Sequence, residues 1–436
     1  MNRKAILTLI LTGMAETAAW SQQSAADSVM QHDRGNRLSI GGYGEVAMTR
    51  NFYSDNTYRY SRAAQYKDDP SHGRFDIPHA VIYMGYNFGK GWTLGTEIEF
   101  EHTGTGSSAE HEFEEAAEWE REQEKGGEVE LEQFWIQKRF SRALNLKIGH
   151  IIVPVGLNNA HHEPLNFFTV YRPEGEDKIL PSTWHDTGLS LWGRVGKFRY
   201  EATLTAGLDA FLFNRDGWIH KGAGSPLEYK VANKYGLSAR IDNYSIPGLR
   251  MAVSGFVGNT LHNSDPHDME NEGNRNKDAK GTVIIGSFDF TYNAHNWIVR
   301  GQADYGHLSD VTAVYAAKAT RARQSNSPYS SDNVGEKAVA IGIEAGYDVF
   351  SQFERLRASD QQMYVFGRFE HYNPYIPAKG QMEYQFTEKN RMAVGINYFP
   401  VPQIAVKAEF SKRFLKQQYN DEPSISVGVA YEGFFL

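Results

Sequence analysis

Ionisable side chains of both signs recur at alternate positions along many segments of this chain. In the segment 91–101, Glu97 and Glu99 share one face, and Trp92 and Leu94 share the other. Opposed charges on the wall of a water-filled passage would set an electric field across it and bias which ions enter. The candidates for such a lining are Glu97, Glu99, Lys147, Arg199, Glu201, Arg240, Asp242, Arg300, Asp304, Glu344, Arg368, Glu370, Arg391, Lys407 and Glu409.

A second concentration of polar and aromatic residues lies in the segment 154–183. Its candidate functional residues are Asn159, His161, His162, Glu163, Tyr171 and Arg172. The run of His161, His162 and Glu163 resembles a set of metal ligands. However, adjacent side chains of an extended segment point to opposite faces, so the two histidines do not converge on one ion. We therefore expect no metal site.

Signals for catalysis, cofactors and nucleic acid are missing from the sequence. There is no G-x-S-x-G, H-E-x-x-H or Walker motif and no cysteine. The run from Asp268 to Gly273 resembles the start of a calcium loop, but Ala279 stands where the bidentate acid is needed. The formal net charge is -8 and the basic residues are scattered, which argues against nucleic acid as a partner. We expect no enzymatic activity and no cofactor.

The elements that must position these residues are strands. Alternation of apolar and polar residues predicts one apolar and one polar face. Many segments run ten residues or more, whereas about 9–11 tilted residues cross a bilayer and strands of soluble sandwiches are usually shorter. We therefore predict an all-β fold, a transmembrane antiparallel up-and-down β-barrel of about 16 strands. The candidate strands are 38–49, 75–87, 91–101, 128–139, 143–153, 184–195, 197–208, 233–243, 249–261, 281–293, 296–307, 336–349, 362–372, 390–399, 403–415 and 424–435.

The connections between these segments alternate between short and long, as periplasmic turns and extracellular loops do in outer-membrane barrels. Two segments depart from the simple pattern. The phase of alternation slips within 128–139, and a β-bulge would explain it. The glutamate-rich segment 107–125 has Ser107 as a possible cap and is followed by glycines, so we predict a short acidic helix in an extracellular loop.

The first residues have the features of an export signal. Arg3 and Lys4 precede a short apolar run, and Ala19 and Ser21 place small residues at the positions that a signal peptidase inspects. We predict a cleaved signal peptide over 1–21, an N-terminal periplasmic stretch over 22–37, and an outer-membrane β-barrel over 38–436. A Gram-negative bacterial outer membrane is the expected location.

Three motifs resemble the general bacterial porin superfamily, and most closely the phosphate-selective porin O and P family of Bacteroidetes. They are Ile40–Glu45, the run from Leu146 through Leu157, and Ser426–Leu436. The resemblance implies a sixteen-stranded barrel, usually a homotrimer, in which the loop after the fifth strand, here 154–183, narrows the pore. This chain departs from the family in lacking a recognisable arginine ladder and in ending at Leu436 rather than phenylalanine, so phosphate specificity is not carried over.

These observations predict a porin that lets small hydrophilic solutes or ions diffuse through a water-filled pore, since the mixed charges favour modest selectivity. The alternative role of those charges is to brace the inner wall through ion pairs. Competing functions are a substrate-specific channel for an oligosaccharide or anion, using aromatics such as Trp218, Tyr171 or Tyr329; a barrel-scaffold enzyme; and a surface adhesin. Expected partners are outer-membrane lipid and the barrel-assembly machinery, which would recognise the C-terminal strand.

Overall fold

The computed structural model describes residues 37–436 apart from 106, 114–118, 126, 160, 182, 226–228, 264–277 and 323–332. The predicted signal peptide and nearly all of the N-terminal stretch lie outside the described residues. The same holds for the calcium-like run from Asp268 to Gly273 and for Tyr329. Among the described residues, no helix is long and apolar enough to cross a membrane.

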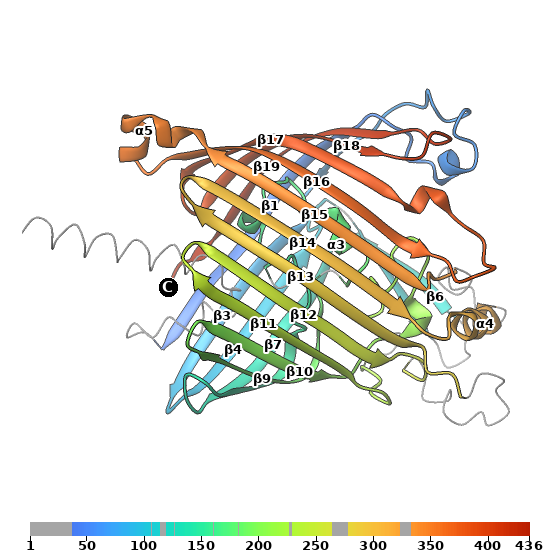
Figure 1. The fold of residues 1–436 in the computed structure, drawn as a ribbon, viewed down its shortest axis with the longest axis horizontal. Helices are drawn as coiled ribbons and strands as arrows, with labels where there is room; N and C mark the ends of the chain where they lie inside the picture. The colour runs from blue at the N-terminus through green and yellow to red at the C-terminus, as the bar shows by residue number, and fades with distance from the viewer. Residues whose placement is uncertain are drawn as a thin grey trace, which may run out of the picture.

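Sixteen antiparallel strands close into one barrel (Figure 1). Closure is made by β1, which pairs with β3 on one edge and with β19 on the other, as in the register pairs Gly42↔Ile82 and Gly41↔Phe434. All sixteen segments expected from the alternation are found as strands. They are β1 (Leu38–Asn51), β3 (His79–Gly89), β4 (Trp92–Glu101), β7 (Glu128–Arg139), β8 (Asn145–Ile152), β9 (His185–Val195), β10 (Phe198–Thr205), β11 (Gly236–Ile246), β12 (Leu249–Asn259), β13 (Thr282–Ala294), β14 (Trp297–Leu308), β15 (Lys337–Asp348), β16 (Gln362–Ile376), β17 (Lys389–Val401), β18 (Ile404–Phe414) and β19 (Glu422–Phe434). A short strand, β2 (Gly73–Asp76), adds to β1 beyond the end of β3.

The polarity of the barrel is inverted relative to a soluble protein. In β11, Ser238, Arg240 and Asp242 are buried, whereas Leu237 and Ile241 are each 55% exposed. The same alternation holds along the other long strands, so the outer surface carries an apolar belt and the interior is polar. An apolar outer face suits hydrocarbon, and a polar inner face suits a water-filled lumen.

The two ends of the barrel differ in their connections (Figure 1). One end has tight hairpins, such as the turn between β13 and β14, where His295 and Asn296 both have positive φ as a primed turn requires. The exception at this end is the connection from β15 to β16, which contains η5 (Val349–Gln352) and α5 (Glu354–Ala358). The other end carries the long connections, including α4 (Val311–Ala322), a helix that the sequence analysis did not predict.

The prediction of a helix over 107–125 is wrong. The described parts form a hairpin of β5 (Ser107–Phe113) and β6 (Trp119–Lys125), which pair antiparallel. The two flanking strands, β4 and β7, pair as far as Glu101 and Glu128, and the hairpin in their connection is a separate two-stranded sheet. A helix would instead place glutamates four residues apart on one face, where like charges repel.

The bulge predicted within 128–139 is confirmed. Glu97 pairs with Gln133 and the next residue, Ile98, pairs with Leu131, so Glu132 has no partner in the register between β4 and β7. As a result, Glu132 and Gln133 are both buried although they are neighbours in sequence. The extra residue of a bulge changes the direction of a side chain in this way.

The long connections fill part of the interior with an apolar core. This loop core joins residues of 153–184, 206–235 and α4, among them Ile179, Phe213 and Val314, with side chains of the barrel wall. Trp218 is fully buried in it and donates its indole N–H to the carbonyl of Gly335 at 3.1 Å. Trp218 is therefore not available as a sugar-binding surface. Shorter helical turns in the connections are η1 (Thr57–Tyr60), η2 (Pro164–Asn166), α3 (Glu174–Asp177), η3 (Ala210–Leu212) and η6 (Gln385–Thr387).

Candidate pore and constriction

The connection 153–184 runs inside the barrel and contacts opposite parts of its wall. Near its start, the carbonyl of Gly156 accepts from Arg240 of β11 at 2.8 Å, and His162 then reaches β4, where its Nε2 lies 3.7 Å from Oε1 of Glu97. A few residues later the backbone meets β18, where the amide of Val170 donates to Glu409 at 2.9 Å. The chain therefore crosses the lumen. We call this segment the crossing loop.

The crossing loop is fastened to β18 by a single buried lysine. The Nζ of Lys407 donates to the carbonyls of Pro164, Phe167 and Thr169, the last two at 2.9 and 3.0 Å. Lys407 is 2% exposed. Hydrogen bonds from a charged donor in such surroundings are stronger than neutral ones, so this lysine holds three carbonyls of the loop in place.

The short helix α3 of the crossing loop carries two glutamates in contrasting environments. Glu174 accepts from the hydroxyl of Tyr372 at 2.8 Å and pairs with Arg413 and, at 3.4 Å, with Arg391. Burial opposes its ionisation, but the two guanidinium groups hold the pKa of Glu174 well below its usual range. Glu176 instead accepts only backbone amides, and burial raises its pKa to about 7.

Charges of opposite sign alternate along the wall formed by β14–β18. Arg300 bonds Glu344 at 2.6 Å, and Glu344 bonds Arg368 at 3.2 Å. Arg368 bonds Glu370 at 3.1 Å, which in turn bonds Arg391 at 3.0 Å. The pairs join neighbouring strands in register, as in Arg300↔Glu344 and Glu370↔Arg391. We call this chain of ion pairs, which Glu409 and Arg413 extend, the paired wall.

The paired wall contains a row of arginines that the sequence did not reveal as a row. Arg300, Arg368, Arg391 and Arg413 come from β14, β16, β17 and β18, and all four face the interior. Every one of them meets a carboxylate. The row is therefore nearly neutral overall, unlike a ladder of free arginines that would attract anions.

A second group of paired charges lies on β10–β13. Arg240 bonds Asp242 and Asp289, each at 3.0 Å, and Arg250 bonds the same two carboxylates at 3.0 and 2.7 Å. Arg199 adds a bond to Glu201 at 2.6 Å. Arg250, whose side chain is 1% exposed, was not among the residues predicted from the sequence. Its inward phase on β12, between Leu249 and Met251, was the available signal.

The wall formed by β1, β3, β4 and β7 is different, because acids there outnumber bases. Glu45, Glu97, Glu99 and Glu132 are all buried, at 6%, 2%, 1% and 1% exposed. The nearest basic side chain on these strands is His79, which hydrogen-bonds Glu99. We call this the acidic wall. Glu132 was not among the sequence candidates, although the alternation in which Val129 and Leu131 face outward places it inward.

The structure brings the candidate lining residues to one surface. Fourteen of the fifteen are buried within the barrel, and Arg300 is the half-buried one. Asp304 is 3% exposed, and Lys147 lies with its Nζ 4.9 Å from the ring centre of Trp135. Whether these residues line a conducting path stays a prediction.

The six candidates of the crossing loop have separate roles. Asn159 is structural: its amide donates to the carbonyls of Val153 and Val155 at 2.6 and 3.2 Å. His161 and His162 point to different neighbours, as expected for adjacent residues. Burial and the nearby arginines hold the pKa of His161 well below its usual range. Among the remaining three, Glu163 is buried, Arg172 is half-buried, and Tyr171 stacks under the guanidinium of Arg74 at 4.9 Å.

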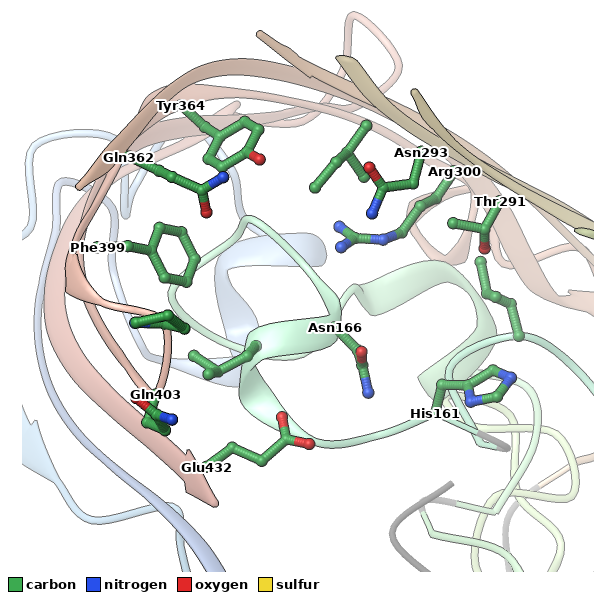
Figure 2. Close-up of a pocket in the computed structure, with 14 residues that line it drawn as sticks. His161, Asn166, Thr291, Asn293, Arg300, Gln362, Tyr364, Phe399, Gln403 and Glu432 are labelled. Atoms are coloured by element: carbon green, nitrogen blue, oxygen red, sulfur yellow. The ribbon is translucent and has the colours of Figure 1, made fainter. Parts of the chain in front are cut away.

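A cavity of about 490 Å³ lies between the crossing loop and the wall (Figure 2). Asn166 projects into it from the loop, Arg300 and Asn293 reach in from one side, and Gln403 and Glu432 lie on the facing side. Its lining combines polar side chains of both charge signs with apolar ones such as Leu165 and Phe399. The cavity can therefore hold water and small solutes that carry polar groups.

Comparison with known proteins shows which sequences and folds this barrel is similar to. No family model matches the chain. A relative from Aquifex aeolicus (strain VF5), described as an uncharacterized protein, is 27% identical over 411 residues, which cover 91% of this chain and 79% of the relative. The anion-selective porin from Comamonas acidovorans is similar in structure, with a TM-score of 0.52, 8% identity, and coverage of 91% of this chain and 99% of the porin.

Two further solved structures share the fold. OmpF of Salmonella typhi, in complex with daunomycin, has a TM-score of 0.51 at 11% identity and covers 92% and 98% of the two chains. The outer membrane channel DcaP of Acinetobacter baumannii has a TM-score of 0.50 at 12% identity, with coverage of 91% and 97%. The fold is that of the general bacterial porins. Together with the apolar belt, it places the chain in the outer membrane.

Proposed function

We propose that the protein is an outer-membrane porin that lets small hydrophilic solutes and ions diffuse through a narrowed lumen. The observation that carries the proposal is the crossing loop, a chain segment fastened across a closed barrel by Arg240 on β11 and by Lys407 and Glu409 on β18, which lies on the opposite side. Such a loop reduces the cross-section without closing the barrel. A wide, unobstructed lumen would need no such fastening.

We further propose that the pore prefers cations. The paired wall and the charges on β10–β13 are largely compensated within themselves. The acidic wall is less compensated, because the basic groups that act on its four glutamates, among the described residues, are histidines, the guanidinium of Arg172 and the ammonium of Lys407. The uncompensated field of the lumen is therefore negative and attracts cations.

Planar-bilayer recording of the purified, folded protein tests both parts. We expect an ohmic conductance and, in a potassium chloride gradient, a reversal potential of the sign that cation preference gives. Replacing 164–180 with a short Gly-Ser linker is expected to increase the conductance. A folded protein that shows no conductance in the intact or the shortened form would refute the porin proposal.

A substrate-specific channel is the second candidate, and the loop core favours it. The core fills part of the barrel interior at the long-loop end with apolar side chains, so the remaining passage is narrower than the barrel alone would allow. Titrating the open pore with malto-oligosaccharides and with dicarboxylates distinguishes the two. Concentration-dependent block by one solute class supports a specific channel, and no block supports general diffusion.

The proposal also includes a family relationship and an oligomeric state. The resemblance of Ile40–Glu45 and Ser426–Leu436 to the porin O and P family supports a shared ancestry without phosphate specificity. A homotrimer is expected from that resemblance, and light scattering of the protein in detergent measures it. A barrel-scaffold enzyme is an alternative that no observation on the described residues favours.

A further inference from the structure

Three side chains from separate segments meet on the acidic wall. Glu97 on β4, Glu132 on β7 and His162 on the crossing loop each bring one nitrogen or oxygen atom within 4.8 Å of the others. They are 2%, 1% and 3% exposed. No neighbouring pair in the sequence predicts this meeting, because it depends on the bulge and on the path of the loop.

Each of the three has one atom held by a neighbour and one atom left free. The Nδ1 of His162 lies 3.2 Å from the carbonyl oxygen of Asn159, so the tautomer with its proton on Nδ1 donates there. That leaves a lone pair on Nε2, which has no hydrogen-bond partner among the described residues. One oxygen of Glu97 accepts from the amide of Gln133, and its Oε1 is free.

Glu132 repeats the arrangement. Its Oε2 accepts from the hydroxyl of Tyr43 at 3.4 Å, while its Oε1 has no hydrogen-bond donor among the described residues. Buried polar atoms are nearly always satisfied, so free atoms on three buried side chains that converge indicate a ligand between them. Histidines and carboxylates that bind metals in proteins are held in the same way, by hydrogen bonds to groups that do not themselves touch the metal.

The charges point to a cation. Glu97 and Glu132 lie beside Glu99, and burying several carboxylates together is costly unless a proton or a cation compensates them. Glu99 has its own partner in His79, and Arg172 supplies one positive charge nearby. Neither His79 nor Arg172 donates a hydrogen bond to the free oxygens of Glu97 and Glu132.

We propose that Glu97, Glu132 and His162 bind a divalent transition-metal cation, for which zinc is the probe. One imidazole and two carboxylates suit zinc and its neighbours, whereas calcium and magnesium prefer oxygen ligands alone. The site is distinct from the His161–His162–Glu163 run that the sequence suggested. Only His162 of that run takes part, and its partners come from two strands.

Zinc binding to the folded, full-length protein in detergent tests the proposal, measured by equilibrium dialysis after treatment with a chelator. We expect one saturable site per chain that a large excess of calcium does not displace. Glu97→Gln, Glu132→Gln and His162→Gln should each weaken zinc binding at least about 10-fold. Only variants that keep the heat-modifiable gel band of the folded barrel are compared. Because three ligands can be substituted separately, the test is possible even if one variant does not fold.

Two matched controls separate this site from other groups. Glu128→Gln removes the same charge from an exposed position on β7. His150→Gln removes a histidine from another pair, in which Nε2 of His150 lies 2.7 Å from Nδ1 of His185. Both should leave zinc affinity unchanged.

The proposal is overturned if the wild-type protein has no saturable zinc site, if calcium displaces the zinc, or if the controls lose binding as the ligand variants do. Cobalt gives a second readout, because its visible absorption changes on entering a site with an imidazole ligand and should not do so in His162→Gln. Neither measurement depends on conduction. A protein that binds zinc but does not conduct would refute the porin proposal alone.

Discussion

The paired wall and the acidic wall are built from the same kind of strand but solve the problem of buried charge differently. On the paired wall, carboxylates such as Glu370 lie between two guanidinium groups on adjacent strands. On the acidic wall, Glu132 has only a tyrosine hydroxyl as donor, and its neighbours are other carboxylates. Breaking a buried pair is costly, whereas removing one of several crowded like charges is not.

The two walls therefore have different consequences for the barrel. A chain of bonded pairs stiffens neighbouring strands and leaves little net field. A cluster of uncompensated carboxylates lowers the stability of the barrel when no cation is bound. The proposed cation would offset that loss. The crossing loop joins the two, since Lys407 fastens it to one wall and His162 reaches the other.

The largest expected effect comes from making one substitution on each wall. Glu370→Gln leaves Arg368 and Arg391 short of a carboxylate and should lower the free energy of unfolding by about 3–5 kcal/mol. Glu132→Gln, measured with a chelator present, should leave it unchanged or raise it by about 1 kcal/mol or less. Denaturant unfolding from lipid vesicles measures both. Equal losses in the two variants would contradict the contrast between the walls.

A somewhat smaller effect is expected at the fastening of the loop. Lys407→Met removes the donor of three buried carbonyls and should cost about 2–3 kcal/mol, with noisier single-channel current because the loop gains freedom. Lys412→Met on the same strand is the control. Lys412 makes a partly exposed pair with Asp421 at 2.7 Å, which is worth about 1 kcal/mol or less. Quiet current in Lys407→Met would show that the loop is held by other contacts.

The two glutamates of α3 predict a pH dependence of defined sign. The raised pKa of Glu176, about 7 against an ordinary 4.5, means that the folded protein keeps a proton that the unfolded chain releases in this window. The free energy of unfolding should therefore fall as pH rises from about 5 to 7, by at most about 1.4 kcal/mol per pH unit. Above pH 7 this contribution is constant.

Glu174 should behave in the opposite way. Its pKa is depressed, so its stabilisation is complete above about pH 4.5 and is lost only as pH falls below it. Of these two glutamates, only Glu176 should titrate between pH 5 and 8. Unfolding at several pH values in the wild type and in Glu176→Gln measures this, and an unchanged slope in the variant would assign the dependence to another group.

The smallest expected effect is on ion preference. The double variant Glu97→Gln/Glu132→Gln removes two charges from the acidic wall and should shift the reversal potential toward zero without changing the conductance greatly. Glu128→Gln, at the exposed end of β7, should shift it less. Zinc added to the wild type should move the potential in the same direction as the double variant. A larger shift from Glu128→Gln would place the selectivity outside the lumen.

Much of the barrel could be read from the chain because the signal is local. In segments such as 233–243 or 390–399 every second residue is apolar, and a period of two fixes both the strand and its outward face. The helix predicted over 107–125 was wrong because the structure of this segment is not set by its local pattern. Composition and possible caps favoured a helix there, but the segment pairs with itself as a hairpin, which composition does not show.

The candidate site was predicted only in part. Inward phase selected Arg368, Glu370 and Lys407, yet it did not say which of them are partners. Glu132 was not selected, although its phase relative to Val129 and Leu131 is inward. Arg250 was missed despite its inward phase.

By itself the sequence determined the strand order, the inverted polarity and many of the charges that face inward, since each follows from alternation along a few residues. Only the tertiary structure decided which charges became pairs and which became a cluster. Register between neighbouring strands joins Glu370 to Arg391, and a bulge with a loop across the lumen brings Glu132 to His162. These distances are set by segments far apart in the chain, and no local pattern encodes them.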